Sequence, residues 1–271
     1  MIRDYGGLSQ LNRTIIGLIP AGGQASRIAP LPCSKELYPI GFRSVQGSVG
    51  VRPKVASHYL LEKMKKAGIS KAYIILREGK WDIPSYWRDG SMVTMDLAYL
   101  VLSLPFGVPY TVDRAYAFVC NDIVAFGFPD ILFEPDDAFA VLLERQAFRN
   151  PDVLLGLFPT DAPEMTDMVD LDPAGRVRDI LVKPAATHLR RTWGIAVWTP
   201  VFTEFLHQYV AAHKDSAAGR SEVSMGDVIA EAIEAGLRIE AEDVSTMPYL
   251  DIGTPANLAR GVKLSAADPI G

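Results

Sequence analysis

Two glycines and two basic residues lie close together near the N-terminus. Gly22 and Gly23 follow a short apolar run and precede Arg27 and Lys35. Consecutive glycines let backbone N–H groups approach a phosphate closely, and the two cations would offset its negative charge. The segment lacks the GK[ST] ending of a Walker A loop and the GxGxxG of a dinucleotide-binding fold. It therefore predicts a site for a phosphorylated ligand, while a glycine turn between two surface cations is the alternative.

The apolar run before these glycines has the pattern of a buried strand and opens a βαβ unit. Residues 14–19 are rich in β-branched side chains, apolar positions recur at helical spacing over 53–68, and 71–76 is a second apolar run. Such a unit implies a right-handed crossover and a mostly parallel sheet, whose ligands bind at the carboxyl ends of the strands. Similar patterns predict helices over 113–120, 137–146, 201–213 and 225–235 and strands over 123–128, 153–158, 177–182 and 194–198. We expect one α/β domain over residues 1–271, with a Rossmann-like, mostly parallel sheet flanked by helices and carrying inserted loops.

The composition argues against several classes of function. The 271 residues include 27 Lys and Arg and 32 Asp and Glu, a net charge of −5, which provides no overall attraction for nucleic acid. The two cysteines lack zinc-ligand spacing and are typical of a reducing compartment. The longest apolar stretch, residues 97–110, is too short to span a bilayer, and residues 1–11 lack the apolar core of a secretory signal. We expect a cytoplasmic protein without a nucleic-acid or membrane partner.

A longer stretch, residues 21–40, reads AGGQASRIAPLPCSKELYPI. It resembles the N-terminal motif AGG-x-G-T-R-L-x-P…K-x-x-x-P of the sugar-1-phosphate nucleotidyltransferases, and it is similar above all to their glucose-1-phosphate thymidylyltransferase branch. Further segments follow in the family's order: Val51-Arg-Pro53, Gly68-Ile69, Asp89-Gly90, Pro129-Asp130, Gly175-Arg-Val177, Lys183-Pro184, Trp193-Gly194 and Leu250-Asp-Ile-Gly-Thr-Pro255. The resemblance spans nearly the whole chain and implies a GT-A-like nucleotidyltransferase fold.

The resemblance also implies a reaction and its partners. A sugar-1-phosphate, or a related polyol phosphate, would attack the α-phosphorus of an NTP and release pyrophosphate. Arg27 would stabilise the leaving pyrophosphate, and Lys35 the α-phosphate and the transition-state charge. The other implied contacts are Ala21, Gly22 and Gly23 with the nucleotide, and Lys183, Asp167 and Gly194 with the sugar phosphate. Dimers and tetramers are frequent in this family, so the resemblance is compatible with a homo-oligomer.

Two aspartates, Asp130 and Asp251, match the family's metal-binding carboxylates. Each closes an apolar run at an expected strand end, and hard oxygen ligands of this kind suit Mg²⁺. Taken singly, Asp130 could instead cap a helix and Asp251 a turn. Their joint presence at motif positions favours the metal.

Several positions depart from the family pattern. Ala25 replaces a third glycine and would be tolerated with a negative φ. Val182 replaces a glutamate that accepts hydrogen bonds from the sugar, and Asp167 aligns with a glycine, so we expect an acceptor with different hydroxyls. Arg114 aligns with a base-reading glutamine. Its donors would suit guanine or cytosine, unless Arg114 faces solvent and another residue reads the base.

Together these observations predict a nucleotidyltransferase that makes an NDP-sugar. Two alternatives remain open. One is a non-catalytic homologue that binds a nucleotide or sugar phosphate in a regulatory role. The other is a cytidylyltransferase that acts on a non-sugar phosphate, such as an alcohol or amine phosphate, and the fold alone does not separate these readings.

Overall fold

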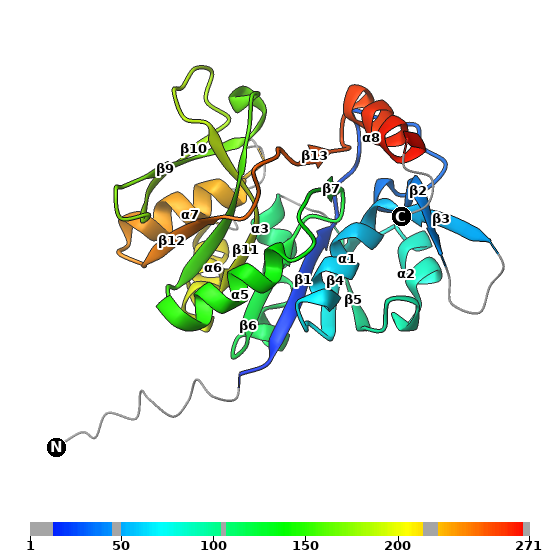
Figure 1. Cartoon of the computed structure of the whole chain (residues 1–271). Coiled ribbons are helices and arrows are strands. Elements are labelled where there is room, and N and C mark those ends of the chain that lie inside the picture. The colour runs from blue at the N-terminus through cyan, green and yellow to red at the C-terminus, as the bar shows by residue number, and fades with distance from the viewer. Residues whose placement is uncertain (1–12, 45–49, 104–106, 214–221, 268–271) are drawn as a thin grey trace.

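The computed structural model describes residues 13–44, 50–103, 107–213 and 222–267 (Figure 1). Residues 1–11, for which the sequence predicts no secretory signal, lie outside this set. Within the described ranges, each helix is too short or too polar to cross a lipid bilayer.

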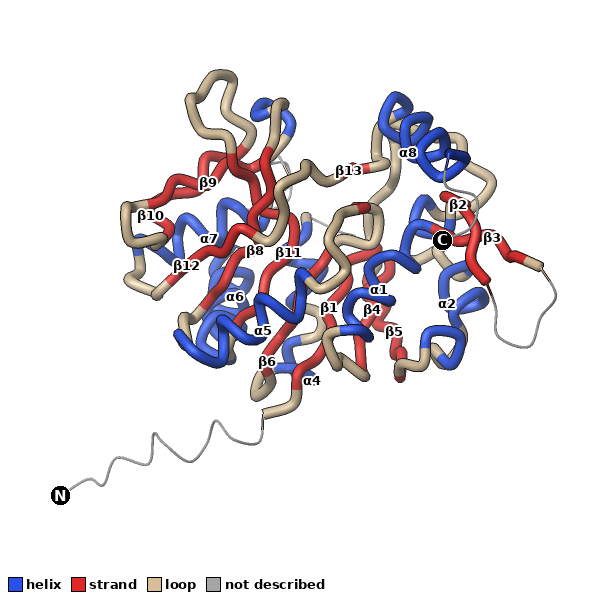
Figure 2. Tube along the Cα trace, in the orientation of Figure 1, coloured by secondary structure: helices blue, strands red, loops and turns tan. Residues whose placement is uncertain are grey.

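A nine-stranded mixed sheet forms the centre of the molecule (Figure 2). Its strands are β1 Ile15–Ala21, β4 Lys71–Arg77, β5 Asp96–Leu102, β6 Ile123–Gly127, β8 Val153–Pro159, β9 Asp167–Leu171, β10 Val177–Val182, β11 Arg191–Trp198 and β12 Ile239–Asp243. The main path is β10-β9-β11-β6-β1-β4-β5, while β8 pairs with β11 and β12. Strands β6, β1, β4 and β5 are mutually parallel, whereas β11 is antiparallel to β6, β8 and β9. The predicted parallel sheet is therefore confirmed for the core strands, and an antiparallel part adjoins it.

Helices cover both faces of this sheet (Figure 1). They are α1 Ala56–Lys66, α2 Asp82–Trp87, α3 Val108–Asp113, α4 Tyr116–Val119, α5 Ala138–Arg149, α6 Pro200–His213, α7 Met225–Glu234 and α8 Pro255–Ala267. Side chains in β1 alternate between the faces, because successive strand residues point in opposite directions. Ile16 and Leu18 pack in the apolar core that also contains α6 and α7, and Ile19 and Ala21 pack in the core that contains α1 and α5.

Several elements differ from the sequence prediction. The helix expected over 53–68 starts at Ala56, because the preceding residues form a strand. The helix expected over 113–120 is instead two short helices, α3 and α4. Pro109 lies in the first turn of α3, a position that suits proline, so helical structure begins before residue 113. Val112, Ala115 and Val119 still face the core, which accounts for the helical spacing in the sequence.

Short elements beyond the main sheet carry residues of the expected site. They are the 3-10 helix η1 Lys35–Leu37 and the strands β2 Pro39–Ser44, β3 Val51–Val55, β7 Ile131–Leu132 and β13 Leu250–Asp251. Strand β2 pairs with β3, and β7 pairs with β13. The β7–β13 pairing joins the segment after β6 to the C-terminal part of the chain, beside α8 (Figure 1).

Candidate active site

A cavity of about 610 Å³ lies beyond the carboxyl ends of β1 and β6. This is where an open parallel sheet binds its ligands. Most residues that the sequence analysis singled out line it, namely Gly22, Gly23, Arg27, Lys35, Asp130, Asp167, Lys183 and Asp251. The fold thus brings into one cavity side chains from the N-terminal, central and C-terminal parts of the chain.

Lys35 begins η1 and directs its ammonium at Asp130. Its Nζ donates to Asp130 Oδ2 at 2.5 Å, and the lysine side chain is 15% exposed. A Cβ built on Gly23 would lie 3.8 Å from the same Nζ. The glycine loop therefore runs beside the Lys35 ammonium, so one phosphate could contact both.

Pairing of β7 with β13 brings Asp130 and Asp251 together. Asp251 is the partner of Ile131 in the register, and the Ile252 N–H donates to the Asp130 carbonyl at 3.1 Å. The Gly253 N–H donates to Asp251 Oδ1 at 2.7 Å and fixes the orientation of that carboxylate. Arg27 approaches from the glycine loop, with its Nη2 3.9 Å from Asp251 Oδ2. Two neighbouring carboxylates therefore lie on this wall, with a cation at each side of the pair.

The charges of this group act on one another. Burial raises the pKa of Asp251, and the Asp130 carboxylate raises it further, since a second negative charge disfavours ionisation. Burial by itself lowers the pKa of Lys35, but Asp130, Glu36 and Asp251 together outweigh it and hold the pKa above its usual value. A divalent cation between the two carboxylates would relieve their repulsion, so the donor set fits Mg²⁺. Among the described residues, no group of three or more His, Cys, Asp or Glu side chains is placed to hold a metal ion. Water and substrate phosphates would therefore complete the coordination.

Asp167 and Lys183 come from neighbouring strand ends. Asp167 is the register partner of Val182, and Lys183 follows with a φ of +41°. The left-handed φ of a lysine that precedes proline is a strained conformation. It turns the chain at the cavity wall, where the exposed Lys183 lies.

The Asp167 carboxylate is enclosed by the start of α7. The Gly226 N–H hydrogen-bonds this carboxylate, and a Cβ on Gly226 would lie 2.6 Å from Asp167 Oδ2. Glycine at this position is therefore required for the close approach. Asp167 Oδ1 has no hydrogen-bond partner, and burial raises the pKa of Asp167 to about 6 despite the opposing charge of Lys183.

Three predicted site residues lie outside the cavity lining. Ala21 is buried at the end of β1. Gly194 lies in β11 against Tyr249, and a Cβ at this position would come within 3.1 Å of the tyrosine ring. The glycine therefore leaves room for Tyr249, which does line the cavity. Arg114 is exposed after α3, and Thr111 faces the cavity instead. The position of Arg114 agrees with the alternative that it faces solvent and does not support the predicted contact with the base.

Ala25 differs from the expectation of a negative φ. Its φ is +55°, the left-handed region that glycine adopts easily and alanine does not. The Ile28 N–H closes a turn on the Ala25 carbonyl at 3.0 Å. The loop thus keeps the conformation of a third glycine although a methyl group has been added.

Some cavity residues were not singled out from the sequence. Glu36 is 2% exposed and contributes to the wall next to Lys35. Burial raises the pKa of Tyr249 to about 12, and the carboxylates of Asp251, Asp167 and Asp130 all act in the same direction. Adjacency to Lys35 and to the Asp251 motif was the available signal for these two residues. Thr111 aligns with a glycine of the family segment in which Arg114 replaces the base-reading glutamine.

The chain matches the nucleotidyl transferase family over residues 16–266 and belongs to that family. The low-salt glycan biosynthesis nucleotidyltransferase Agl11 of Haloferax volcanii is 25% identical over 259 residues, covering 93% of this chain and 66% of the relative. A glucose-1-phosphate thymidylyltransferase of Streptomyces griseus is 25% identical, over 84% of this chain and 60% of the relative. The chain thus spans less than two thirds of these relatives. The resemblance noted for residues 21–40 is confirmed.

A crystal structure from Bacillus anthracis, named for glucose-1-phosphate thymidylyltransferase and containing sucrose, has a similar fold. The TM-score is 0.78 at 22% identity, and the match covers 93% of this chain and 95% of the other. At this identity the likeness concerns the fold. It confirms the predicted α/β architecture of the nucleotidyltransferase type.

Proposed function

We propose that the protein transfers a nucleotidyl group from an NTP to a sugar-1-phosphate and releases pyrophosphate. The observation that carries this proposal is the convergence of Arg27, Lys35, Asp130 and Asp251 on one cavity. Two polyanions repel each other, so they react only where fixed positive charge holds both in place. The names of the two relatives support the same class of reaction.

Lys35 and Arg27 would supply the fixed positive charge. Lys35 is held at Asp130 by a short ion pair, so its ammonium needs little reorganisation to contact the α-phosphate. Arg27 has a side chain that is 58% exposed and lies across from Asp251, which leaves it free to close on the leaving pyrophosphate. In these roles both cations stabilise charge that develops in the transition state.

Asp130 and Asp251 would hold Mg²⁺. When bound, the ion neutralises phosphate charge and orients the reacting groups. Lys35 Nζ donates to Asp130 Oδ2, and its two remaining N–H groups would be available to a substrate phosphate. The Gly253 N–H keeps Asp251 in a fixed orientation throughout.

The acceptor would bind near Asp167 and Lys183. Lys183 would contact its phosphate, and Asp167 would meet its hydroxyl groups from the strand next to Val182. The carboxylate is thus present on β9 although β10 carries valine. This exchange supports an acceptor whose hydroxyl arrangement differs from that of glucose-1-phosphate, because a polar site rejects analogues that leave its groups unpaired. The nucleobase would lie along Gly107 and Thr111, on the wall formed by the start of α3.

Pyrophosphate release tests the proposal directly. Purified protein with Mg²⁺ is supplied with each of the common NTPs and a panel of phosphate monoesters, which includes hexose-1-phosphates, polyol phosphates, and alcohol and amine phosphates. We expect turnover with a sugar-1-phosphate. NTP binding by calorimetry without turnover for any pair would favour the non-catalytic alternative, and turnover only with an alcohol or amine phosphate would favour the other one.

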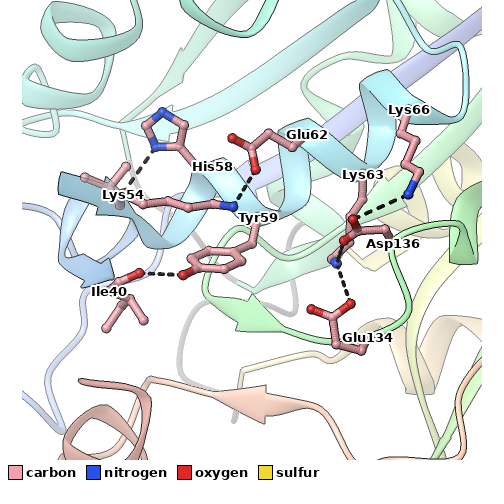
Figure 3. A network of polar contacts seen from close by, with 10 residues as sticks. Ile40, Lys54, His58, Tyr59, Glu62, Lys63, Lys66, Glu134 and Asp136 are labelled. Carbon is pink, nitrogen blue, oxygen red and sulfur yellow. Dashed lines mark hydrogen bonds and ion pairs between the residues drawn. The ribbon is translucent and has the colours of Figure 1, made fainter. Parts of the chain in front are cut away.

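Replacement of Lys35 by methionine tests whether the Lys35 ammonium stabilises the transition state. Lys35→Met keeps the side-chain length and removes the charge, so we expect kcat to fall by about 10²–10³-fold. Lys54→Met is the matched control, since Lys54 pairs with Glu62 at 2.6 Å on α1 (Figure 3) and is absent from the cavity lining. Equal kcat for Lys35→Met and the control would refute the assignment.

A further inference from the structure

Both sequence neighbours of Lys35 are held by one short segment that follows β4. The Ser34 N–H and Oγ donate to the two carboxylate oxygens of Asp82 at 2.6 Å and 2.7 Å. Lys80 Nζ donates to Glu36 Oε1 at 2.7 Å. Lys35 is therefore flanked on each side by a residue that is anchored to the same three-residue stretch.

The ion pair of Lys80 with Glu36 is buried. The two side chains are 5% and 2% exposed, respectively, and Glu36 Oε2 has no other partner. Burial raises the pKa of Glu36 and lowers that of Lys80, so each group depends on the other to stay charged. Removal of one member would leave an uncompensated buried charge, whereas removal of both would not.

The charges of both Glu36 and Asp130 act on Lys35. While Lys80 neutralises Glu36, the Lys35 ammonium bonds with Asp130 on the cavity wall. Without Lys80, Glu36 could keep its charge only by drawing the Lys35 ammonium away from Asp130.

We propose that Lys80 and Asp82 are positioning residues, which hold Glu36 and Ser34 so that the Lys35 ammonium points at Asp130 and the substrate phosphates. Neither residue is among the described residues that line the cavity. Both therefore act through their partners. The catalytic meaning of this inference rests on the proposed nucleotidyl transfer, but the orientation of Lys35 can be tested without it.

Two variants test the role of Lys80 by kinetics. In Lys80→Met, kcat should fall about 10- to 100-fold with a smaller change in the KM for the NTP, because a misplaced catalytic group costs about this much. In the double variant Glu36→Gln/Lys80→Met, no buried charge is left unpaired, and kcat should recover most of the loss. Lys80→Arg, which keeps the charge, should also retain activity. Lys54→Met remains the control for loss of a lysine in an ion pair.

Crystal structures of the same variants separate this inference from the proposed function. We expect Lys35 Nζ to contact Glu36 in Lys80→Met and to return to Asp130 in the double variant. A wild-type protein without turnover, but with this exchange of partners, would refute the proposed function and support the positioning role. Wild-type kcat in Lys80→Met with Lys35 still on Asp130 would overturn the inference, as would a double variant no more active than the single one.

Asp82→Ala provides a second arm if Lys80→Met fails to fold. Asp82 is half-buried at the start of α2, so its loss should leave the core intact. The substitution removes the carboxylate that holds Ser34, the residue before Lys35. We expect kcat to fall about tenfold and the melting temperature to change little. Unaltered kcat in Asp82→Ala would refute the role of Asp82, and with it the two-sided support of Lys35.

Discussion

At the scale of single residues, Asp167 is a carboxylate in a place where its charge is costly. It is half-buried next to the start of α7, and its buried Oδ1 has no hydrogen-bond partner. Residues retained at a cost to stability are common at sites of function. We therefore expect Asp167→Asn to weaken acceptor binding and, at the same time, to stabilise the fold.

The stability effect has a defined dependence on pH. The pKa of Asp167 is about 6 in the fold and 3.8 when unperturbed, so the folded chain binds this proton more tightly. The resulting stability is complete below about pH 4 and is lost as the pH rises through 6. Between pH 7.5 and pH 5 the wild type should gain about 1 kcal/mol in the free energy of unfolding from this group.

Urea unfolding at the two pH values measures this gain. Asp167→Asn should lack it and should be more stable than the wild type at pH 7.5. Asp161→Asn is a suitable control, because Asp161 is exposed in the same part of the chain. An unchanged pH dependence in Asp167→Asn would contradict the assigned pKa.

Ala25 provides a second test at the residue scale. Its φ of +55° costs an L-residue about 1–2 kcal/mol, while glycine adopts it freely. Greater freedom of glycine in the unfolded chain offsets part of this gain, so we expect Ala25→Gly to raise the melting temperature by about 1–3 °C. Ala140→Gly within α5 should lower it instead. Equal decreases for both variants would show that the loop is not strained.

At the scale of elements, a buried lysine ties the segment after Asp130 to α1. Lys63 is 2% exposed and bonds with Asp136 and, at 3.3 Å, with Glu134 (Figure 3). Its ammonium also lies 5.3 Å from the centre of the Phe133 ring. The turn that follows β7 is thereby fixed to the helix. Because Asp130 lies at the other end of β7, we expect this attachment to help position it.

Lys63→Met tests this attachment. Glu134 and Asp136 are more than half exposed and can be hydrated once the lysine is gone, so we expect a loss of only about 1–2 kcal/mol in stability. The Mg²⁺ concentration for half-maximal activity should rise severalfold, because Asp130 is less well positioned. Lys66→Met is the matched control, since Lys66 contacts the same Asp136 at 3.5 Å from an exposed position. Identical Mg²⁺ titrations for both variants would contradict the proposal.

At the scale of the whole molecule, the cavity joins segments from distant parts of the chain. The glycine loop, the β7–β13 pair and the ends of β9 and β10 all contribute to it. A ligand that bridges them binds only the folded state and therefore stabilises it. Thermal unfolding thus reports on binding without any need for turnover.

We expect NTP with Mg²⁺ to raise the melting temperature of the whole chain. At about 100 times the dissociation constant, the gain is about 2.7 kcal/mol, or about 5–10 °C for a protein of this size. The part of the shift that depends on Mg²⁺ should disappear in Asp251→Asn. A shift that is equal with Mg²⁺ and with a chelator would refute the assignment of Asp130 and Asp251 as the metal site.

The sequence by itself determined the βαβ start of the fold and the glycine loop that follows β1, with Gly22, Gly23, Arg27 and Lys35 in the cavity wall. These features are local: alternation and helical spacing record which side of a segment is buried, and a loop after a parallel strand lies at the ligand-binding edge. The motif resemblance added Asp130 and Asp251, which no local pattern could have paired.

Only the tertiary structure decided the remaining contacts. The antiparallel part of the sheet set Asp167 beside Gly226, the start of α3 placed Thr111 rather than Arg114 on the cavity wall, and the segment after β4 brought Lys80 to Glu36. Such contacts join segments far apart in the chain. Their energies depend on burial and on the partners that packing supplies, and neither is encoded in the spacing of nearby residues.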